Sequence, residues 1–279
     1  MSESRWYVEA LDGECGLTIR IERMLYESQS PFQKIEIFEN KTLGRVMALD
    51  GAIMLTERDE HCYHDMLVHP AMLASPHPKR VLVIGGGDGG TLREVLKHPE
   101  VEEAVLCEID GEVIEASRQF LPTLAVNFDH PKAKLHVGDG VAYIRENQNA
   151  FDVILIDSGD PVGFAEGLFR EPFYRDVKAA LKKPGIIAQQ TETPYLAMMN
   201  WGRTFGELRK VFSEVHVYAG NVPMYPGGYW TYAFASPDLD PWECFDPERV
   251  KKLGELKYYR AGLQQAAFVL PGILKGAEG

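Results

Sequence analysis

Acidic side chains follow several apolar runs that have the composition of buried parallel strands. Asp88 lies in the glycine-rich run 85–90, directly after the apolar stretch 81–84, and Glu108 closes the next stretch, 104–107. The full set at such strand ends is Asp88, Glu108, Asp139, Asp157 and Asp160. Each alone could cap a helix or start a turn. Because parallel strands end at one edge of a sheet, five carboxylates there would repel one another and predict a cationic ligand.

The glycine run itself fits a nucleotide-binding pattern. Gly85, Gly87 and Gly90 satisfy G-x-G-x-x-G, although the same spacing suits a tight strand-to-helix turn without a ligand. Asp88 inside this loop would repel a pyrophosphate and suit a positive group. Glu108 lies about where an acidic residue meets ribose hydroxyls in nucleoside-binding folds. The ligand that we expect is therefore a nucleoside that carries positive charge.

The elements that must position these acids alternate from residue 81 onward. Strands are predicted at 81–84, 104–107, 133–137, 151–156, 186–190, 214–219 and 230–235, and helices at 91–98, 111–120, 140–147, 172–182, 195–212 and 258–268. This alternation predicts an α/β fold, a doubly wound and mostly parallel sheet with helices on both faces.

The first part of the chain has a different period. The segments 18–23 and 34–39 alternate polar and apolar residues, which is typical of strands with one buried face. We expect a small N-terminal antiparallel β-domain over residues 1–60 and a nucleoside-binding domain over 61–279. The N-terminal strands are expected to expose edges and apolar surface that a second copy of the chain would cover.

A helix predicted from residue 59 to 69 carries His61, Asp65 and His69 on one face. Such i, i+4, i+8 spacing can hold zinc, but the H-E-x-x-H arrangement with a general base is missing. Histidines at a junction between two domains explain the pattern without an ion. We therefore predict no metal site.

Composition excludes several classes of protein. The 279 residues are 45% hydrophobic and 25% charged, with a net charge of -12, which argues against a nucleic-acid partner. The sequence has no apolar run of the ~18–20 residues that span a membrane, and the first residues do not resemble a signal peptide. Four scattered cysteines without a C-x-x-C pair favour free thiols and a cytoplasmic location.

A resemblance to a known family rests on many motifs in order. They are GGGDGGTLRE (85–94), EID (108–110), GDG (138–140), DSGDP (157–161), AEGLF (165–169) and VPMYP (222–226), with SPFQ (30–33), ALDG (48–51) and YYRA (258–261). The chain resembles the spermidine synthases, which are polyamine aminopropyltransferases. The resemblance implies a small β-domain joined to a methyltransferase-like Rossmann fold, in a homodimer or homotetramer.

The resemblance also implies a reaction and its residues. An aminopropyl group moves from decarboxylated S-adenosylmethionine, a co-substrate rather than a cofactor, to a polyamine, usually putrescine, and methylthioadenosine is released. Donor-binding residues would be Gln33, Asp88, Glu108, Asp139, Gly140 and Phe164. Acceptor-binding residues would be Tyr63, His64, Asp157, Ser158, Gly159, Asp160, Gln190 and Tyr225. Asp157 matches the proton acceptor of the family.

The chemistry agrees with these roles. A primary amine has a pKa of about 10.4, so at pH 7 it is protonated and cannot attack until a base removes a proton. Asp157 can be that base if burial and like-charge neighbours such as Asp160 raise its pKa. The sulfonium is already an activated leaving group, so the reaction needs no metal. The segment 159–169 is predicted to be a mobile loop that closes over the site.

Two positions leave the identity of the acceptor open. Gly159 stands where the family usually carries Thr or Ser, and Phe164 stands where Pro is usual. Agmatine, cadaverine or a longer polyamine is therefore an alternative acceptor. A methyltransferase would share the fold and the nucleoside site but would leave Asp160 and Tyr225 without a role. A nicotinamide oxidoreductase would fit the glycine spacing but not Asp88 or Asp139. A non-catalytic polyamine-binding protein is the alternative from a different class.

Overall fold

The computed structural model describes residues 5–11, 14–161, 163–196 and 198–274. As predicted, the chain begins with a run of strands and continues with strands and helices that alternate. The strands are β1 (Arg5–Leu11), β2 (Cys15–Ile21), β3 (Arg23–Gln29), β4 (Lys34–Asn40), β5 (Gly44–Leu49), β6 (Ala52–Thr56), β7 (Arg80–Gly85), β8 (Glu103–Glu108), β9 (Ala133–Val137), β10 (Phe151–Asp157), β11 (Leu181–Gln190), β12 (Glu214–Asn221) and β13 (Tyr229–Ser236). The helices are α1 (Glu60–Ala74), α2 (Gly90–Val95), α3 (Gly111–Phe120), α4 (Gly140–Glu146), α5 (Glu171–Ala180), α6 (Met198–Arg209), α7 (Pro247–Val250) and α8 (Leu263–Ala266). Short 3-10 helices are η1 (Ala125–Asn127), η2 (Gly163–Phe169), η3 (Lys251–Leu253) and η4 (Gly272–Leu274).

The larger sheet is doubly wound. Its strand order is β12-β13-β11-β10-β7-β8-β9, and β13 runs antiparallel to both of its neighbours. The other neighbouring pairs are parallel. β7 pairs with β8 on one side and with β10 on the other, so the winding of the chain reverses there. A crevice at the carboxyl ends of strands forms at such a reversal.

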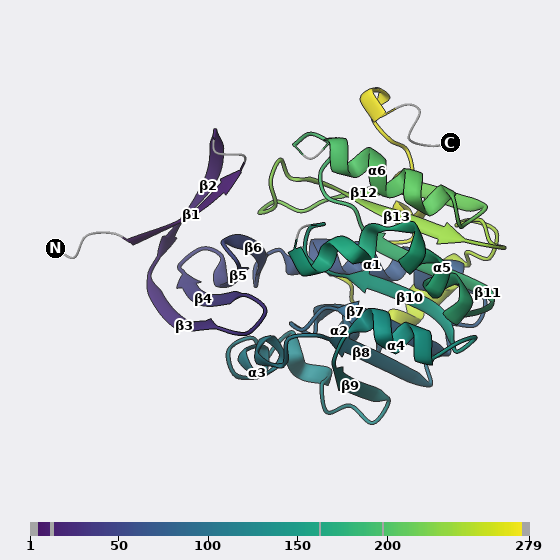
Figure 1. Ribbon diagram of the computed structural model, residues 1–279, viewed down its shortest axis with the longest axis horizontal. Coiled ribbons are helices and arrows are strands. Elements are labelled where there is room, and N and C mark those ends of the chain that lie inside the picture. The colour runs from purple at the N-terminus through teal and green to yellow at the C-terminus, as the bar shows by residue number, and fades with distance from the viewer. Residues whose placement is uncertain (1–4, 12–13, 162, 197, 275–279) are drawn as a thin grey trace.

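Helices cover both faces of this sheet because its central strands are apolar on both sides. In β7, Val81 and Val83 pack into one core with α1 and α2, whereas Leu82 and Ile84 pack into a second core with α4, α5 and α6. Figure 1 looks onto the layer of α4, α5 and α6, with α1 behind the sheet. The predicted α/β fold class is confirmed.

The N-terminal strands form two antiparallel sheets, a hairpin of β1 and β2 and a four-stranded sheet of β3 to β6. They lie at one end of the molecule, to the left in Figure 1. Ile35, Ile37 and Met47 of the four-stranded sheet share a core with Val113 and Ala116 of α3. The small sheet is thus packed directly on the larger part of the chain. The division of the chain at residue 60 stays a prediction.

One predicted helix is largely wrong. Of residues 258–268, only Leu263–Ala266 form α8. The backbone N–H groups of Tyr258 and Tyr259 instead donate to Oδ2 of Asp65 at 3.0 and 2.9 Å. This tertiary contact fixes the segment against α1 and outweighs its local helix propensity. No helix among the described residues combines the length and the apolar character that a membrane span requires.

Candidate active site

The predicted acidic rim is present at the carboxyl edge of the large sheet. Asp88 follows β7, Glu108 ends β8, Asp139 follows β9 and Asp157 ends β10. Gly87 in the loop of Asp88 donates its N–H to Oε2 of Glu108 at 3.1 Å, which joins the first two acids directly. Four acids that are distant in sequence therefore share one edge of the sheet.

Glu108 is the most enclosed acid of this rim. Its carboxylate accepts backbone N–H groups from Gly87 and, at 2.9 Å, from Asp110. Burial, and the charges of Asp110 and Asp157, raise its pKa to about 7, although the two backbone hydrogen bonds act in the opposite direction. Asp110 also accepts the side-chain amide of Gln33 at 3.0 Å, so Gln33 reaches this side of the rim from the small sheet.

Asp139 has an exposed side chain and caps α4 by accepting the N–H of Val141 at 2.8 Å. Gly140 begins α4 against β7, where an added Cβ would lie 2.7 Å from Cγ2 of Ile84. A side chain at residue 140 would therefore push α4 off the strand.

Asp157 is held by two hydroxyl groups. Tyr63 donates to its Oδ1 and Thr91 to its Oδ2, both at 2.6 Å. Burial and the charge of Asp88 raise its pKa, while the charge of His64 and the two hydroxyl hydrogen bonds oppose that rise. The like-charge neighbour with the leading effect on the pKa of Asp157 is thus Asp88. Thr91 was missed by sequence reasoning, although it follows the glycine run directly.

The loop after β10 is fastened to β11. Gln190 is buried and donates its amide to the carbonyl groups of Ser158 and Gly159, at 3.1 and 3.3 Å. Burial raises the pKa of Asp160, against a hydrogen bond from Gln190. An added Cβ on Gly159 would have no neighbour within 4 Å, so the backbone there borders open space. Phe164 belongs to η2, and its side chain lies outside the described part of the structure.

Two tyrosine rings form a wall beside Asp157. The ring centroids of Tyr63 and Tyr225 are 5.5 Å apart. Tyr225 donates its hydroxyl to the carbonyl of Met54 in the small sheet. This bond also ties the small sheet to the rim.

His64 lies between two carboxylates. Its Nδ1 is 2.7 Å from Oε2 of Glu60, and its Nε2 is 3.3 Å from Oδ1 of Asp88. Burial lowers the pKa of His64, but the two carboxylates together raise it well above 6.5. The ring is therefore cationic at neutral pH.

Two further acids, which sequence reasoning missed, lie near Asp160. Glu9 comes from β1 and Glu192 follows β11, and both are buried. The pKa of Glu9 is raised to about 7 by burial and by the charge of Asp160, against a backbone hydrogen bond from Ile53. The same two causes raise that of Glu192 to about 8. Glu192 follows a strand end, a signal that could have found it, but nothing in the local sequence around Glu9 does so.

The histidine face of α1 makes a separate buried network. Nε2 of His69 lies 3.2 Å from Oε2 of Glu94 and 3.7 Å from Oδ1 of Asp65. Lys97 places its ammonium 2.6 Å from the same Glu94 oxygen. Burial lowers and the two carboxylates raise the pKa of His69, with a net rise. Cationic side chains thus already accompany Asp65 and Glu94 in this network.

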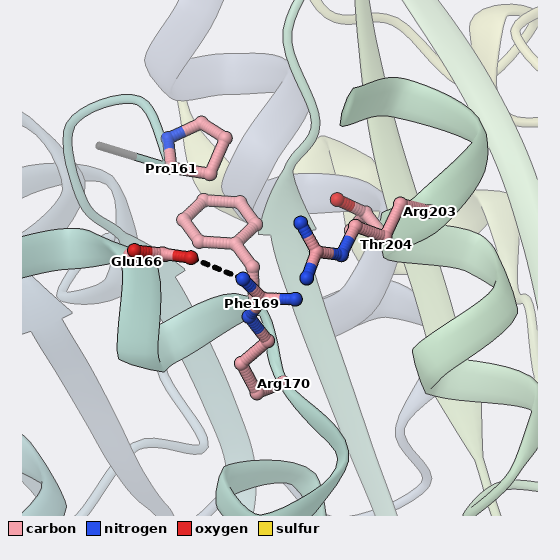
Figure 2. A pocket seen from close by; sticks show the side chains of 6 residues that line it. All are labelled: Pro161, Glu166, Phe169, Arg170, Arg203 and Thr204. Atoms are coloured by element: carbon pink, nitrogen blue, oxygen red, sulfur yellow. Dashed lines mark hydrogen bonds and ion pairs between the residues drawn. The ribbon is translucent and has the colours of Figure 1, made fainter. Parts of the chain in front are cut away.

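A small cavity lies behind the loop of η2. It has a volume of about 20 Å³, room for one water molecule, and its lining residues are Pro161, Glu166, Phe169, Arg170, Arg203 and Thr204. Figure 2 shows the ion pair of Glu166 in η2 with Arg170, which precedes α5, and the Arg203 side chain of α6 directed toward it. This space is too small for a nucleoside.

Comparison with known proteins matches almost the whole chain. A family model described as the spermine/spermidine synthase domain matches residues 60–243, and one described as the spermidine synthase tetramerisation domain matches residues 5–57. A polyamine aminopropyltransferase of Thermotoga maritima is 48% identical over 273 residues, which are 97% of this chain and 92% of the relative. Polyamine aminopropyltransferase 1 of Bacillus cereus is 42% identical over 266 residues, 95% of this chain and 96% of the relative.

Solved structures agree with this result. A crystal structure of spermidine synthase in complex with the transition state analogue AdoDATO has a TM-score of 0.96 and 46% identity, and the match covers 99% of this chain and 97% of that one. The spermidine synthase of Thermotoga maritima has a TM-score of 0.94 and 46% identity, covering 99% of this chain and 94% of that one. Such agreement extends from the large sheet to the small N-terminal sheets.

Proposed function

Because the chain belongs to the spermine/spermidine synthase family and is an aminopropyltransferase, we propose that it transfers the aminopropyl group of decarboxylated S-adenosylmethionine to putrescine. The products are spermidine and methylthioadenosine. The amine nitrogen forms a bond to the carbon beside the sulfonium, the carbon–sulfur bond breaks, and the sulfur keeps the electron pair. The proton of the attacking ammonium goes to Asp157.

The observation that carries the proposal is the environment of Asp157. Its two oxygens accept hydrogen bonds from Tyr63 and Thr91, which fix the carboxylate, and its pKa is raised by burial and by Asp88. A base with a raised pKa takes a proton from an ammonium more readily than an ordinary Asp does. The rate gain beyond this proton transfer comes from alignment of the two substrates.

The donor is assigned to the side of the rim that Glu108 and Asp139 form. Glu108 would take the ribose hydroxyls, Asp139 the adenine amino group, and Asp88 the ammonium of the aminopropyl arm. Gln33 contacts Asp110 beside Glu108, which supports its assignment to the donor. Gly140 lets α4 approach the strand at the adenine end, and Phe164 is assigned to the donor as well.

The acceptor is assigned to the side of Asp157 and Asp160. The nitrogen that attacks would lie at Asp157, the methylenes against the wall that the rings of Tyr63 and Tyr225 form, and the second ammonium at Asp160. His64, Ser158, Gly159 and Gln190 would complete this side of the site. Glu9 and Glu192 add two carboxyls near Asp160, which supports a cationic acceptor with a charged far end.

The same carboxyl groups could also bind acceptors longer than putrescine. Gly159 borders open space, and three acids lie where a third nitrogen or a guanidinium would reach. Agmatine, cadaverine or a longer polyamine is therefore the second candidate acceptor. The four cysteines are free thiols, which supports a cytoplasmic location for the enzyme.

We also propose that the working enzyme is a homodimer or homotetramer. The chain matches a tetramerisation domain over residues 5–57. In β1, Trp6 is 55% and Val8 60% exposed on the same face, an apolar surface that a second copy would cover.

The test is an acceptor panel. Purified protein and decarboxylated S-adenosylmethionine are incubated with putrescine, cadaverine, agmatine or spermidine, and products are identified by mass spectrometry. We expect methylthioadenosine and spermidine, with the highest kcat/KM for putrescine. A tenfold preference for another amine, about 1.4 kcal/mol in the transition state, would replace putrescine as the acceptor. Polyamine binding without methylthioadenosine release would indicate a non-catalytic binder.

A further inference from the structure

We propose, on the basis of the aminopropyl transfer proposed above, that Glu60 is a positioning residue. It holds His64 as a fixed positive charge beside Asp88 and Asp157, and this charge keeps Asp157 ionised and able to act as the base at neutral pH. Glu60 acts only through His64.

Glu60 is rigidly placed for this role. It is the first residue of α1, and His64 follows one helical turn later, so their side chains meet on one face of the helix. Oε2 of Glu60 lies 2.7 Å from Nδ1 of His64. From α2, Arg93 clamps the same carboxylate with two nitrogens, at 3.1 and 2.8 Å. All three side chains have little freedom, because Glu60 is 4% and His64 2% exposed and Arg93 is partly buried.

The contacts of the ring define its protonation state. One ring nitrogen of His64 faces Glu60 and the other faces Asp88, at 3.3 Å. Two carboxylates are acceptors only, so the ring meets both with N–H groups when it is an imidazolium. Gly90 makes this position possible, because a Cβ there would lie 2.3 Å from Cε1 of His64.

The positive charge of His64 acts on Asp157 across the site. The charged and titratable side chains around the ring, among the residues that the structure describes, are Glu60 and Tyr63 of α1, Asp88 after β7, Arg93 of α2 and Asp157 at the end of β10. Burial alone would raise the pKa of Glu60, but His64 and Arg93 lower it to about 2, so Glu60 stays ionised. Burial and Asp88 raise the pKa of Asp157, and the charge of His64 limits that rise.

The variant that isolates the charge is Glu60→Gln. It keeps the size of the side chain and can still hydrogen-bond to Nδ1, which leaves a neutral ring that donates from Nε2 to Asp88. Without the imidazolium, Asp157 protonates at higher pH. We expect the acid limb of the kcat/KM profile for putrescine, measured from pH 5 to 9, to move up by about one unit or more. Activity lost at pH 7 should return toward the alkaline end.

The matched control is Glu94→Gln. Glu94 is also a buried glutamate in contact with Arg93, but its other partners are His69 and Lys97 rather than His64. We expect a similar loss of thermal stability from this variant and an acid limb at the wild-type position. A uniform loss of activity at all pH values in Glu60→Gln, with the limb unmoved, would overturn the proposal. If Glu60→Gln does not fold, Glu60→Asp replaces it, because this variant keeps the charge but holds it one methylene further from His64. The acid limb of the pH profile should then move in the same direction by a smaller amount. An acid limb at the wild-type position in folded Glu60→Asp would overturn the proposal.

A second readout needs no turnover. In protein labelled with ¹⁵N-histidine, the His64 resonances, assigned by their loss in His64→Gln, should report an imidazolium at pH 7 in wild type and titrate at lower pH in Glu60→Gln than in wild type. A neutral His64 in wild type at pH 7 contradicts the inference. Failure of wild type to release methylthioadenosine would instead contradict the proposed function, so the two failures are distinguishable.

Discussion

At the scale of single residues, the chemistry of the site depends on the environment of a few carboxyl groups. The proposal that Asp157 is the base rests on the two hydroxyls that orient it and on burial and Asp88, which raise its pKa. The carboxyl of Glu192 has a different setting, since burial and Asp160 raise its pKa. We therefore propose that the carboxyl of Asp157 serves proton transfer and that of Glu192 serves cation recognition.

Asp157→Asn tests the base. The amide keeps the size of the side chain but cannot accept the proton, so we expect kcat to fall by about 10²–10⁴-fold. Steady-state release of methylthioadenosine, with circular dichroism to verify the fold, measures this. Turnover at the wild-type rate would mean that the proton leaves by another route.

The variant Glu192→Gln tests the raised pKa of the Glu192 carboxyl through the pH dependence of the stability of the folded protein. Its pKa is about 8 in the folded protein, against 4.5 for an unperturbed glutamate, so between these values the folded protein holds a proton that the unfolded chain has lost. Stability from this group is full below pH 4.5 and is lost as pH rises through 8.

Thermal melts of wild type and Glu192→Gln at several pH values between about 5 and 8.5 measure this effect. We expect the melting temperature of the variant to fall less with rising pH than that of wild type. Parallel curves for the two proteins would show that Glu192 is ionised in the fold.

At the scale of elements, the junction of β7 and α2 brings the two halves of the site together. Its loop presents Asp88, and the first turn of α2 supplies Thr91 to Asp157. His64 from α1 packs directly on Gly90. Because Gly90 has no side chain, α1 and α2 can approach closely there, and the ring of His64 lies beside the acidic rim.

Gly90→Ala tests this packing. A methyl group would overlap the His64 ring, so the variant should lose about 1–3 kcal/mol of stability and also lose activity as the ring is displaced. The control is Gly202→Ala in α6, where an added Cβ meets no atom within 4 Å. The control should be neutral or slightly stabilising, because alanine favours a helix. Equal stability and activity of both variants would show that His64 does not need this contact.

At the scale of the whole molecule, the small N-terminal sheets contribute to the site and leave a surface uncovered. Met54 accepts the hydroxyl of Tyr225, and Glu9 of β1 reaches the neighbourhood of Asp160. The opposite face of β1 exposes Trp6 and Val8. Association of copies through this hairpin would hold Glu9 in place, so assembly and acceptor binding should be linked.

Trp6→Asp combined with Val8→Asp tests the interface. Charges on this face should lower the mass measured by light scattering and raise the KM for the amine acceptor. Val269→Asp is the control, because Val269 is 78% exposed but lies far along the chain, after α8. A wild-type protein that is monomeric at micromolar concentration would contradict the proposed assembly.

The sequence by itself determined the features that local patterns encode. Apolar runs of about four to six residues predicted the strands of the large sheet, because a strand buried on both faces has no polar positions. The rule that parallel strands end at one edge then predicted that Asp88, Glu108, Asp139 and Asp157 would lie together, as they do. The order of these motifs also indicated the family correctly.

Tertiary structure alone decided which groups surround those acids. Glu9 becomes a neighbour of Asp160 only through the packing of the β1–β2 hairpin, and no local pattern encodes that proximity. The charge of His64 likewise depends on Glu60, Asp88 and Arg93, which come from three elements. A pKa reflects burial and nearby charge, and both exist only once the chain has packed.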